Sequence, residues 1–565
     1  MKTNKYSCKY NHYVTYFWLM KQFNIQNQSN IQIGGRSNKK KWTTFIHNGV
    51  LFPPEYIPHG IPIIYNNNQK VYLSPEAEEM ATIFSKYTDT DYIKNKVFTK
   101  NFWKDWKNIL GKDNTIQSLE LCNFSLIYNH LLEEKERKKN MSKEEKEEIK
   151  REKEEMEKKY KTAYIDGKPQ PVGNFRVEPP GIFIGRGCHP KLGKIKRRIY
   201  PEDVTLNLSK NAPIPETLEG HKWGSIIHDQ NVEWLASWKD EITGKIKYVW
   251  LAAHSDLKAE SDKNKYELAR KLKRNIKKIR EENDKNLQSS DLATRQIATA
   301  LYFIDNLALR VGNEKGEDEA DTVGVTSLRV EHVKLSDNNT ITLDFLGKDS
   351  VPYHNTVQVP PQVYQNLKEF MDNKNLDDPL FDKINSNDVN KYLQNFMKGL
   401  SAKIFRTMSA SNLFQKELNK ITKKYDGMDM SDKINILLDE FNRANAKVAV
   451  LCNHQKNISK NFNDQVEKIN EKIKNVKKKL SKAKKDKNKD KIKKLENDLQ
   501  KLKVKKDLKI EMKNISTSTS KHNYIDSRIT ISFMKKHNLP IDKIFNKALQ
   551  ERFKWAFDVG PDWQF

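Results

Sequence analysis

The sequence has little of what several large protein classes require. Only 4 of its 565 residues are cysteines, and no two of them form a C-x-x-C pair, so their spacing offers no structural zinc site. Four scattered thiols are typical of a reduced intracellular protein without disulfides. No segment fits G-x-x-x-x-G-K-[ST], the loop that cradles nucleotide phosphates. We therefore expect neither a structural metal nor ATP use through a P-loop.

Long hydrophobic runs are also missing. The longest apolar cluster near the N-terminus covers residues 13–20, far short of the roughly 20 residues that a membrane-spanning helix needs. We expect no membrane as a partner.

Positive charge, in contrast, is abundant. Lys and Arg number 102 against 74 Asp and Glu, a formal net charge of +28, while only 37% of residues are hydrophobic. An excess of this size indicates a polyanionic partner, with nucleic acid first and an anionic membrane as the weaker alternative. A chain of this length predicts two to four domains.

The N-terminal segment lacks acidic residues. None precedes Glu55, whereas eight Lys or Arg do. We expect residues 1–40 to be a basic leader, either a disordered tail that touches nucleic acid or a transit sequence. Its low arginine content favours the tail.

The rest of the chain divides by pattern into lobes. Residues 41–255 alternate short strand-like and helical stretches and include a solvated charged helix at about 131–160, where Ser142 and Glu145 form a capping box. Residues 256–457 mix helices with one clear hairpin, in which apolar residues alternate up to Phe345 before the turn at 347–350.

The segment at about 458–513 is strongly basic. Residues 466–513 hold 20 Lys against 8 acidic residues, and apolar residues recur at steps of three and four on either side of a break at 485–490. This favours an antiparallel helical hairpin that is basic outside, and a disordered basic tract is the alternative. Residues 514–565 predict a small helical domain behind a flexible joint.

Five residues stand out once a metal-free phosphoryl transfer on DNA is considered, since that reaction needs a nucleophile, cations for the phosphate oxygens and an acid for the leaving oxygen. Each alone has an ordinary interpretation, as a packing tyrosine, a surface cation or a structural histidine. Together they occur in the order Arg, Lys, Arg, His, Tyr. The motifs are Leu307-Ala-Leu-Arg-Val-Gly-Asn-Glu-Lys315, Phe345-Leu-Gly-Lys-Asp-Ser350, Ala402-Lys-Ile-Phe-Arg-Thr407, Leu451-Cys-Asn-His-Gln455 and Ser520-Lys-His-Asn-Tyr-Ile-Asp526.

This ordered set closely resembles that of the eukaryotic type IB topoisomerases. The likeness runs from about Lys41 to Phe565, and it includes Asn101-Phe-Trp-Lys-Asp-Trp106 and Glu178-Pro-Pro-Gly181. The resemblance implies relaxation of positive and negative supercoils by single-strand cleavage, a covalent 3′-phosphotyrosine, strand rotation and religation.

The resemblance also implies roles for single residues. Tyr524 matches the nucleophile; Arg310, Arg406 and His454 match groups that bind the non-bridging phosphate oxygens. Lys348 matches the hairpin lysine that protonates the 5′-oxygen. Four further residues match DNA-binding positions, namely Arg186, Lys258, Asp349 and Asn523. The positions around the pocket for this family's intercalating inhibitors match Phe183, Arg186, Asp349 and Asn523.

Two substitutions depart from the family pattern. Ile184 stands where an arginine is usual, and Asp256 replaces a basic residue near Lys258. Both remove positive charge close to DNA, so we expect weaker or more salt-sensitive binding with the catalytic set untouched.

The chemistry agrees with these roles and with the absence of a cofactor. A tyrosine with the usual pKa of about 10 is only about one part in a thousand ionised at neutral pH, so cations must favour the phenolate. The covalent product is itself a phosphodiester, so resealing needs no ATP, and divalent cations are at most stimulatory. We expect no metal site.

Two other functions remain as alternatives. A tyrosine recombinase uses the same order of residues but usually has a histidine three positions before its second arginine, where this chain has Lys403. A non-catalytic DNA clamp would suit the charge and the hairpin equally well. The pair Asp89 and Asp91 resembles the acidic cluster of metal-dependent topoisomerases, but it follows a helical stretch and is interpreted as a helix end.

The predicted fold is multidomain α/β and α. Mixed α/β cap lobes and a mainly helical catalytic lobe of tyrosine-recombinase type close as a clamp on duplex DNA, especially supercoiled DNA, and the protein is expected to be monomeric. The coiled-coil hairpin reaches over downstream DNA, and the C-terminal domain delivers Tyr524. The resemblance favours the nucleus, while the basic leader keeps a mitochondrion or another DNA-containing organelle open.

Overall fold

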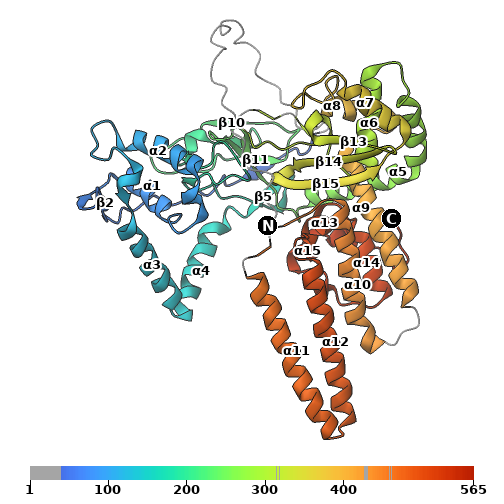
Figure 1. The fold of residues 1–565 in the computed structure, drawn as a ribbon. Coiled ribbons are helices and arrows are strands. Elements are labelled where there is room, and N and C mark those ends of the chain that lie inside the picture. The colour runs from blue at the N-terminus through green and yellow to red at the C-terminus, as the bar shows by residue number, and fades with distance from the viewer. Residues whose placement is uncertain (1–39, 314, 317–318, 426–429, 457, 460) are drawn as a thin grey trace. The chain divides into compact units, whose positions relative to one another are not determined.

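The computed structural model describes residues 40–313, 315–316, 319–425, 430–456, 458–459 and 461–565 (Figure 1). The prediction of a basic leader at residues 1–40 therefore lies almost wholly outside the described residues. The chain is a mixed α/β protein, as predicted. It forms two compact units: unit 1 contains the described residues up to Ser255 and those of segment 315–321, and unit 2 contains the remainder.

In its described residues, unit 1 is built from small sheets and the helices α1 to α4. Its sheets have the strand orders β1-β5-β6, β3-β2-β4, β7-β8 and β10-β9-β11-β12, and among these named strands β9 and β10 pair in parallel while the others pair antiparallel. The helices are α1 (Pro75–Ser85), α2 (Lys96–Leu110), α3 (Ser125–Asn140) and α4 (Lys143–Lys158). The strands are β1 (Phe45–His47), β2 (Ile63–Tyr65), β3 (Gln69–Val71), β4 (Cys122–Asn123), β5 (Thr162–Ile165), β6 (Lys168–Pro171), β7 (Gly181–Ile182), β8 (Ile195–Lys196), β9 (Thr205–Asn207), β10 (Ser225–Ile227), β11 (Trp234–Lys239) and β12 (Ile246–Trp250).

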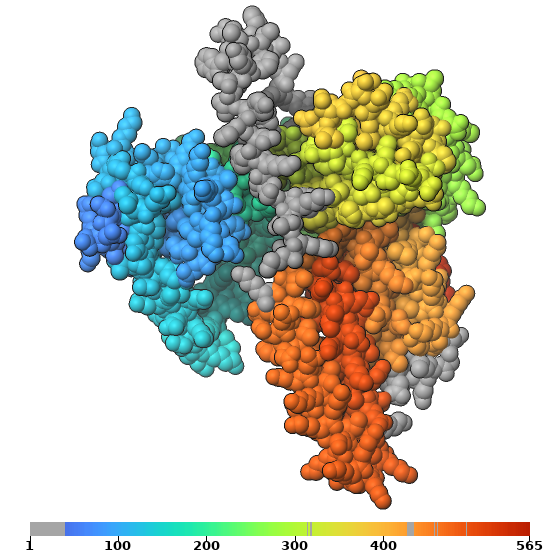
Figure 2. Space-filling view, in the orientation of Figure 1, coloured from blue at the N-terminus to red at the C-terminus, as the bar shows by residue number. Residues whose placement is uncertain are grey.

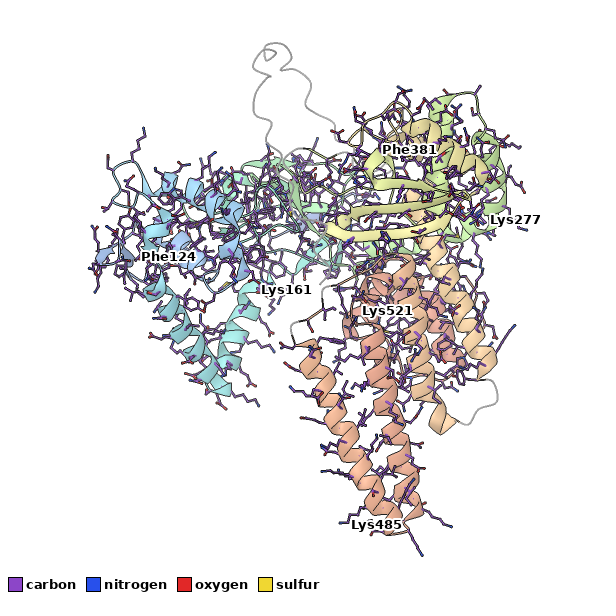
Figure 3. All side chains as sticks on the ribbon, viewed as in Figure 1. Phe124, Lys161, Lys277, Phe381, Lys485 and Lys521 are labelled. Atoms are coloured by element: carbon purple, nitrogen blue, oxygen red, sulfur yellow. The ribbon has the colours of Figure 1, made fainter. Side chains whose placement is uncertain are left out.

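Aromatic side chains fill the core beneath α1 and α2. The rings of Phe84 and Phe102 stack with their centroids 4.0 Å apart, and Phe98 and Trp106 are fully buried beside them. Figure 3 labels Phe124, which packs edge-on against Phe84. Each such ring removes a large apolar area from water, which makes this cluster the main stabilising element of that part of unit 1.

The charged segment expected as one helix at about 131–160 is two helices. Helix α3 ends at Asn140, Met141 adopts an extended conformation, and α4 begins at Lys143 (Figure 1). The backbone N–H of Glu145 donates to Ser142 Oγ at 3.1 Å, and the N–H of Ser142 donates to Glu145 Oε2 at 2.7 Å. The predicted capping box is confirmed. It satisfies the first amides of a new helix, which explains why one helix was the wrong prediction.

Unit 2 combines helices with one antiparallel sheet. Its sheet has the order β13-β14-β15, and the predicted hairpin is confirmed as β14 and β15, which pair from Thr340↔Gln358 to Gly347↔Val351. The strands are β13 (Val333–Ser336), β14 (Thr340–Gly347) and β15 (Val351–Gln358). The helices up to the hairpin segment are α5 (Asp256–Asn286), α6 (Leu292–Asn306), α7 (Pro361–Met371), α8 (Ser386–Phe396), α9 (Ala402–Lys424) and α10 (Met430–Leu451).

The basic segment after α10 contains two long helices, α11 (Phe462–Lys485) and α12 (Lys489–Glu511). They pack side by side and form a continuous column of side chains, orange to red in Figure 2, with Lys485 at its tip in Figure 3. Along the contact Ile469, Ala483 and Leu508 are buried, while most of the lysines are exposed. Opposed apolar stripes therefore hold the pair together and leave its outer surface basic.

The last fifty residues carry α13 (Thr517–Asn523), α14 (Ser527–Lys536) and α15 (Lys547–Arg552). Their buried side chains, among them Ile529 and Phe553, belong to the same hydrophobic core as Phe405 of α9. Ion pairs also tie this segment to α5, including one between Arg552 and Asp262 at 3.2 Å. Residues 514–565 are thus part of unit 2 rather than a compact unit of their own.

Two further findings bear on the sequence analysis. Among the described cysteines, Cys122 and Cys452 are free thiols, and Cys452 is buried. None of the helices in the described ranges combines the length and the apolar character that crossing a membrane would require.

Candidate active site

Four of the five candidate catalytic residues come together in unit 2. Arg406 lies in the first turns of α9, Tyr524 follows the last residue of α13, and His454 lies just after α10. Arg310 follows α6, beyond a left-handed residue at Ala308. Segments more than 200 residues apart in the sequence therefore converge on one point.

Arg406 is the fixed centre of the group. Its side chain is only 4% exposed, and its guanidinium donates to the carbonyl oxygens of Ala308 and Cys452, the latter at 3.0 Å. These carbonyls belong to the segments that carry Arg310 and His454. These two acceptors stabilise a buried charge, so Arg406 both needs these segments and holds them together, while its buried Nε has no hydrogen-bond partner among the described residues.

The loop that presents Arg310 depends on a close contact between two glycines. A Cβ built on Gly324 would lie 2.4 Å from the Cα of Gly312 and 2.8 Å from the carbonyl oxygen of Arg310. Gly312 itself has a φ of +89°. The N–H of Val325 then donates to that carbonyl at 2.9 Å. Any larger residue at position 324 would push the Arg310 backbone out of place.

His454 is buried and neutral. Its Nδ1 lies 2.7 Å from the hydroxyl oxygen of Ser520, and its Nε2 is buried with no hydrogen-bond partner in the described part of the chain. Burial, with the charges of Arg406 and Arg310, lowers the pKa of His454 to about 3. In the tautomer whose Nδ1 accepts from the serine hydroxyl, Nε2 carries the proton and can donate to a ligand.

Tyr524 lies against both charged and neutral members of the group. Its ring centroid is 5.1 Å from Arg406 Cζ and 5.2 Å from the His454 ring. Burial by itself would raise the pKa of Tyr524, but the charges of Arg406 and Arg310 outweigh that effect and hold it below the usual value. A phenol whose anion is favoured in this way is a better nucleophile.

Lys348 is not in contact with the other four residues. It is exposed at the turn between β14 and β15, and no hydrogen bond or ion pair of its side chain is recorded within the described ranges. The hairpin is nevertheless fixed close to this turn, where Asn453 Nδ2 donates to the Pro352 carbonyl at 3.1 Å and Gln455 Nε2 donates to the same carbonyl at 3.2 Å. The segment that carries His454 thus also orients the hairpin that carries Lys348.

The remaining candidates are more scattered. Asp349 follows Lys348 in the turn with a φ of +67°, and Asn523 is the last residue of α13, next to the nucleophile candidate; both are exposed. Lys258 lies in the first turn of α5, half-buried. Phe183 and Arg186 belong to unit 1, and so does Ile184, whose side chain is exposed.

Phe183 and Arg186 lie in a tight loop between β7 and β8. The ring of Phe183 packs edge-on against that of His189, with the centroids 4.7 Å apart, and Gly185 between them has a φ of +37°. A Cβ at Gly185 would lie 2.8 Å from the Cβ of His189. The loop therefore requires glycine at this position.

Sequence reasoning missed the groups that position the candidates. Ser520 holds His454, and Ser411 of α9 donates to the carbonyl of Tyr524 at 3.0 Å while accepting from the N–H of Asp526 at 3.0 Å. Ser520 lies within the quoted Tyr524 motif, four residues before the tyrosine, and that proximity was the available signal. Ser411 is five residues after Arg406, and the sequence offered no signal for it.

Together these groups form a cationic cluster suited to a phosphate diester. Two guanidiniums and one imidazole N–H surround a tyrosine whose ionised form is favoured. Such donors stabilise the extra negative charge of a phosphorane. Within the described residues, no group of three or more His, Cys, Asp or Glu is arranged to hold a metal ion.

Comparison with known proteins places most of the chain in one family. Residues 40–251 match the DNA binding fragment of eukaryotic DNA topoisomerase I, and residues 254–487 match its catalytic core. Residues 496–565 match the C-terminal topoisomerase domain.

Individual relatives agree with this match. DNA topoisomerase 1 beta of Arabidopsis thaliana is 44% identical over 95% of this chain, and DNA topoisomerase 1 alpha of the same plant is 47% identical over 93%. The chain spans only 61% and 60% of the lengths of these two relatives. Human DNA topoisomerase 1 is 42% identical over 93% of this chain and 72% of its own length.

Proposed function

Because this chain belongs to the eukaryotic DNA topoisomerase I family, we propose that it relaxes supercoiled duplex DNA by transient single-strand cleavage, as a type IB enzyme. The observation that carries the proposal is the position of Tyr524 against Arg310, Arg406 and His454. Positive and negative supercoils are both substrates.

The first step is attack by Tyr524 Oη on the phosphorus of a DNA phosphodiester. The lowered pKa of the phenol supports this role, because it raises the fraction of phenolate at neutral pH. The new bond joins the tyrosine to the 3′-phosphate, and the bond from phosphorus to the 5′-oxygen breaks. One phosphodiester replaces another, so no ATP is consumed.

Arg310, Arg406 and His454 stabilise the crowded phosphorane. The guanidiniums donate to its non-bridging oxygens, and the neutral His454 donates through Nε2. The buried and unpartnered Nε2 supports this assignment, since a buried polar atom without a partner in the free protein is ready for a ligand.

Lys348 supplies the proton to the departing 5′-oxygen. Its place at the tip of a hairpin that is tied to the His454 segment supports a group that enters the DNA groove beside the site. A positioned acid of this kind contributes about 10²–10⁴ in rate. Religation runs the same steps backwards, with the 5′-hydroxyl as nucleophile after the strand has rotated.

Other residues act on DNA without chemistry. Arg186, Lys258, Asp349 and Asn523 contact the duplex near the scissile phosphate. Phe183 lines the position of intercalating inhibitors together with Arg186, Asp349 and Asn523. Ile184 and Asp256 lower the positive charge at neighbouring positions and so weaken phosphate contacts.

The architecture follows from the same family membership. Unit 1 provides the cap lobes and unit 2 a tyrosine-recombinase-like catalytic lobe, which together enclose DNA as a clamp in the monomer. Helices α11 and α12 act as a coiled coil over the downstream duplex. The reaction needs no metal. The protein acts in the nucleus, and a mitochondrion or another DNA-containing organelle is the alternative location.

Plasmid relaxation in EDTA without ATP tests the proposal. Wild-type protein should relax the plasmid and, when trapped with denaturant, remain bound to a 3′ DNA end. The variant Tyr524→Phe should bind DNA but form no adduct, and Tyr425→Phe is the matched control because Tyr425 lies at the C-terminal end of α9, whereas Arg406 lies near its N-terminal end. Adduct formation by Tyr524→Phe would contradict the assignment. Junction products between two DNA sites would indicate a recombinase, and binding without cleavage a DNA clamp.

A further inference from the structure

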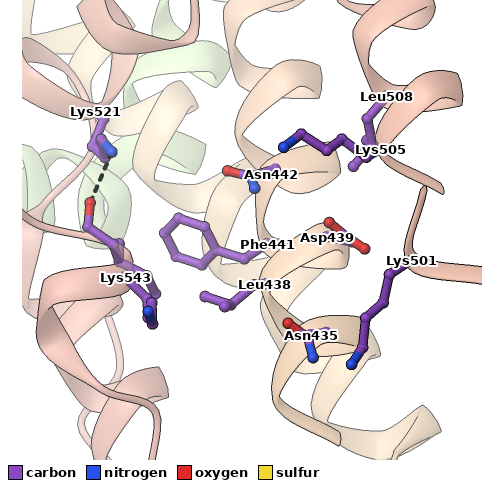
Figure 4. Close-up of a pocket in the computed structure, with 11 residues that line it drawn as sticks. Asn435, Leu438, Asp439, Phe441, Asn442, Lys501, Lys505, Leu508, Lys521 and Lys543 are labelled. Atoms are coloured by element: carbon purple, nitrogen blue, oxygen red, sulfur yellow. Dashed lines mark hydrogen bonds between the residues drawn. The ribbon is translucent and has the colours of Figure 1, made fainter. Parts of the chain in front are cut away.

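A second cationic cavity lies in unit 2, outside the candidate active site. It has a volume of about 420 Å³ and is bounded by α10, α12 and the segment after α12. In Figure 4, α10 lies between Lys521 and Lys543 on one side and Lys501 and Lys505 on the other. The lining residues are Asn435, Leu438, Asp439, Phe441, Asn442, Lys501, Lys505, Leu508, Lys521, Lys543 and Ile544.

Positive charge dominates this cavity. Four lysines line it, and Asp439 is the single acidic residue among its lining groups. Two of the lysines come from α12, one from α13 and one from the short turn Ile541–Lys543. Cations brought together from three separate elements repel one another unless an anion joins them.

The lysines are poorly neutralised by neighbouring acids. Lys501 reaches Asp498 only at 4.0 Å, and Lys543 reaches Asp542 at 3.9 Å. For Lys505 no ion pair is recorded among the described residues. The ammonium of Lys521 donates to the carbonyl of Ile544 at 3.0 Å and has no acid to pair with in the same part of the structure.

The remaining wall is suited to a small molecule. Leu438 and Phe441 give it an apolar floor, and the amides of Asn435 and Asn442 provide further hydrogen-bonding groups. A volume of this size is typical of small-ligand sites, and it does not admit a duplex.

We propose that this cavity binds a small polyphosphate anion, which joins the hairpin helix α12 to α10 and to the segment that carries Tyr524. Several phosphates match cations on both sides of α10 better than one phosphate does, because each lysine then has a charge-assisted partner. The inference does not depend on the proposed reaction, since it concerns binding by the protein without DNA.

Isothermal titration calorimetry of the full chain with inorganic triphosphate tests the proposal, at physiological ionic strength and without divalent cations that would compete for the anion. We expect saturable binding with one site per chain. The double variant Lys501→Gln/Lys505→Gln should weaken it by about tenfold or more, since each charge-assisted bond contributes more than a neutral one. Lys543→Gln should weaken it as well, from the other side of α10.

The control is Lys478→Gln/Lys482→Gln, which removes the same charge from exposed positions on α11 outside the cavity. It should leave the affinity unchanged. Equal weakening by both double variants, or heat that never saturates, would overturn the proposal. So would a result in which triphosphate does not bind and Lys501→Gln/Lys505→Gln instead weakens binding of a short DNA duplex, because the lysines would then serve the DNA backbone.

Discussion

Arg406 combines a structural role with the proposed chemical one. Its guanidinium is buried between the carbonyls of Ala308 and Cys452, and it faces the ring of Tyr524. The planar fork of arginine can satisfy two carbonyls and still present a donor to a ligand, whereas the ammonium of lysine is a compact point charge. Charge alone is therefore insufficient at this position.

The variant Arg406→Lys tests this point. We expect the rate of single-turnover DNA cleavage to fall by about 10²-fold or more, the usual effect of losing one preorganised donor to a developing oxyanion. DNA affinity should change little, because the net charge is kept. Arg443→Lys is the control, since Arg443 lies on the surface of α10 paired with Glu511. A cleavage rate like that of wild type would show that the fork geometry is unimportant.

His47 in unit 1 gives a pH-dependent contribution to stability. Its Nε2 donates to the carbonyl of Asn207 at 3.1 Å and its Nδ1 accepts from the N–H of Gly49 at 3.0 Å. Burial lowers the pKa of His47 to about 4 and outweighs its hydrogen bonds with the backbones of Asn207 and Leu235, which raise that pKa. Protonation of Nδ1 would break the bond from Gly49. The unfolded chain takes up this proton near pH 6.5, so stability falls as the pH drops from there towards 4.

We expect His47 to destabilise the folded protein by about 2 kcal/mol at pH 5 relative to pH 7. The variant His47→Gln cannot take up the proton, so its melting temperature should fall less than that of wild type between these pH values. Melting curves of both proteins at pH 7 and pH 5 make the measurement. Equal falls would contradict the neutral state of His47. His354→Gln is the control, because His354 is an exposed residue of β15.

At the scale of elements, the β14–β15 hairpin depends on the segment after α10. Asn453 has a left-handed backbone with a φ of +49°, and its amide is bonded to Pro352 beside the turn of the hairpin. The bond aligns the Lys348 turn with the residues around His454. Loss of the bond should therefore affect the leaving-group step rather than DNA binding.

The variant Asn453→Gly removes the amide while keeping a residue that tolerates positive φ. We expect cleavage to slow by about tenfold, the lower part of the range for general acid catalysis, with DNA affinity unchanged. A substrate whose 5′-oxygen is replaced by a better leaving group needs less of this acid and should recover the rate. Asn338→Gly is matched, since Asn338 also has positive φ and lies in the turn at the other end of the same sheet. If this substrate does not restore the cleavage rate of Asn453→Gly, the variant is defective in a step other than protonation of the leaving oxygen.

The α11–α12 hairpin contributes charge rather than catalytic groups. Replacing residues 466–513 by a short bridge removes 20 Lys and 8 acidic residues. We expect the protein to release DNA after fewer relaxation cycles at moderate salt while cleavage remains detectable, because electrostatic contacts to the backbone hold it on DNA. Relaxation in the presence of competitor DNA measures this. Complete loss of cleavage would show that the hairpin is needed for the chemistry.

Local patterns predicted the elements better than their contacts. Strict alternation up to Phe345 gave the β14–β15 hairpin, and steps of three and four predicted helices on both sides of residues 485–490, where α11 ends and α12 begins. The sequence predicted the capping box at Ser142, but the prediction did not include the new helix that begins after this capping box.

Such local patterns could not predict which residues contact one another in the candidate active site. The ordered motifs named the residues that meet, but the carbonyls that hold Arg406, the serine beside His454 and the contact between Gly312 and Gly324 all join distant segments. Side-chain periodicity reports the face of an element and not its partner, so these contacts require the folded chain.

At the scale of the molecule, the excess positive charge is concentrated in two segments. Of the net charge of +28, residues 466–513 contribute +12, and the segment before Glu55 contributes eight Lys or Arg without an acidic residue. Binding to DNA by such a protein is driven mainly by the release of counterions from phosphates, so sequence preference should be weak.

Salt should therefore weaken DNA binding steeply. Between about 50 and 200 mM salt we expect the affinity for a plasmid-derived duplex to fall by about 10³-fold or more, as for proteins with several phosphate contacts. Titrations by fluorescence anisotropy at several salt concentrations give the slope. Restoring a cation with Asp256→Lys should steepen the slope, while Asp337→Lys, in the β13–β14 turn, should not. A shallow slope would indicate binding through base contacts instead.

The shared core of α9 and the segment after the hairpin has a consequence for how the protein is made. A ribosome completes Arg310, Arg406 and His454 long before it reaches Tyr524, and the residues that follow the tyrosine must still be added before Phe405 is covered. Under the proposed mechanism, a nascent chain carries the phosphate-binding groups without the nucleophile, so we expect no strand cleavage before translation has passed Tyr524. A premature stop within the hairpin yields a product that lacks the proposed nucleophile and leaves part of the apolar core of unit 2 uncovered, which favours aggregation.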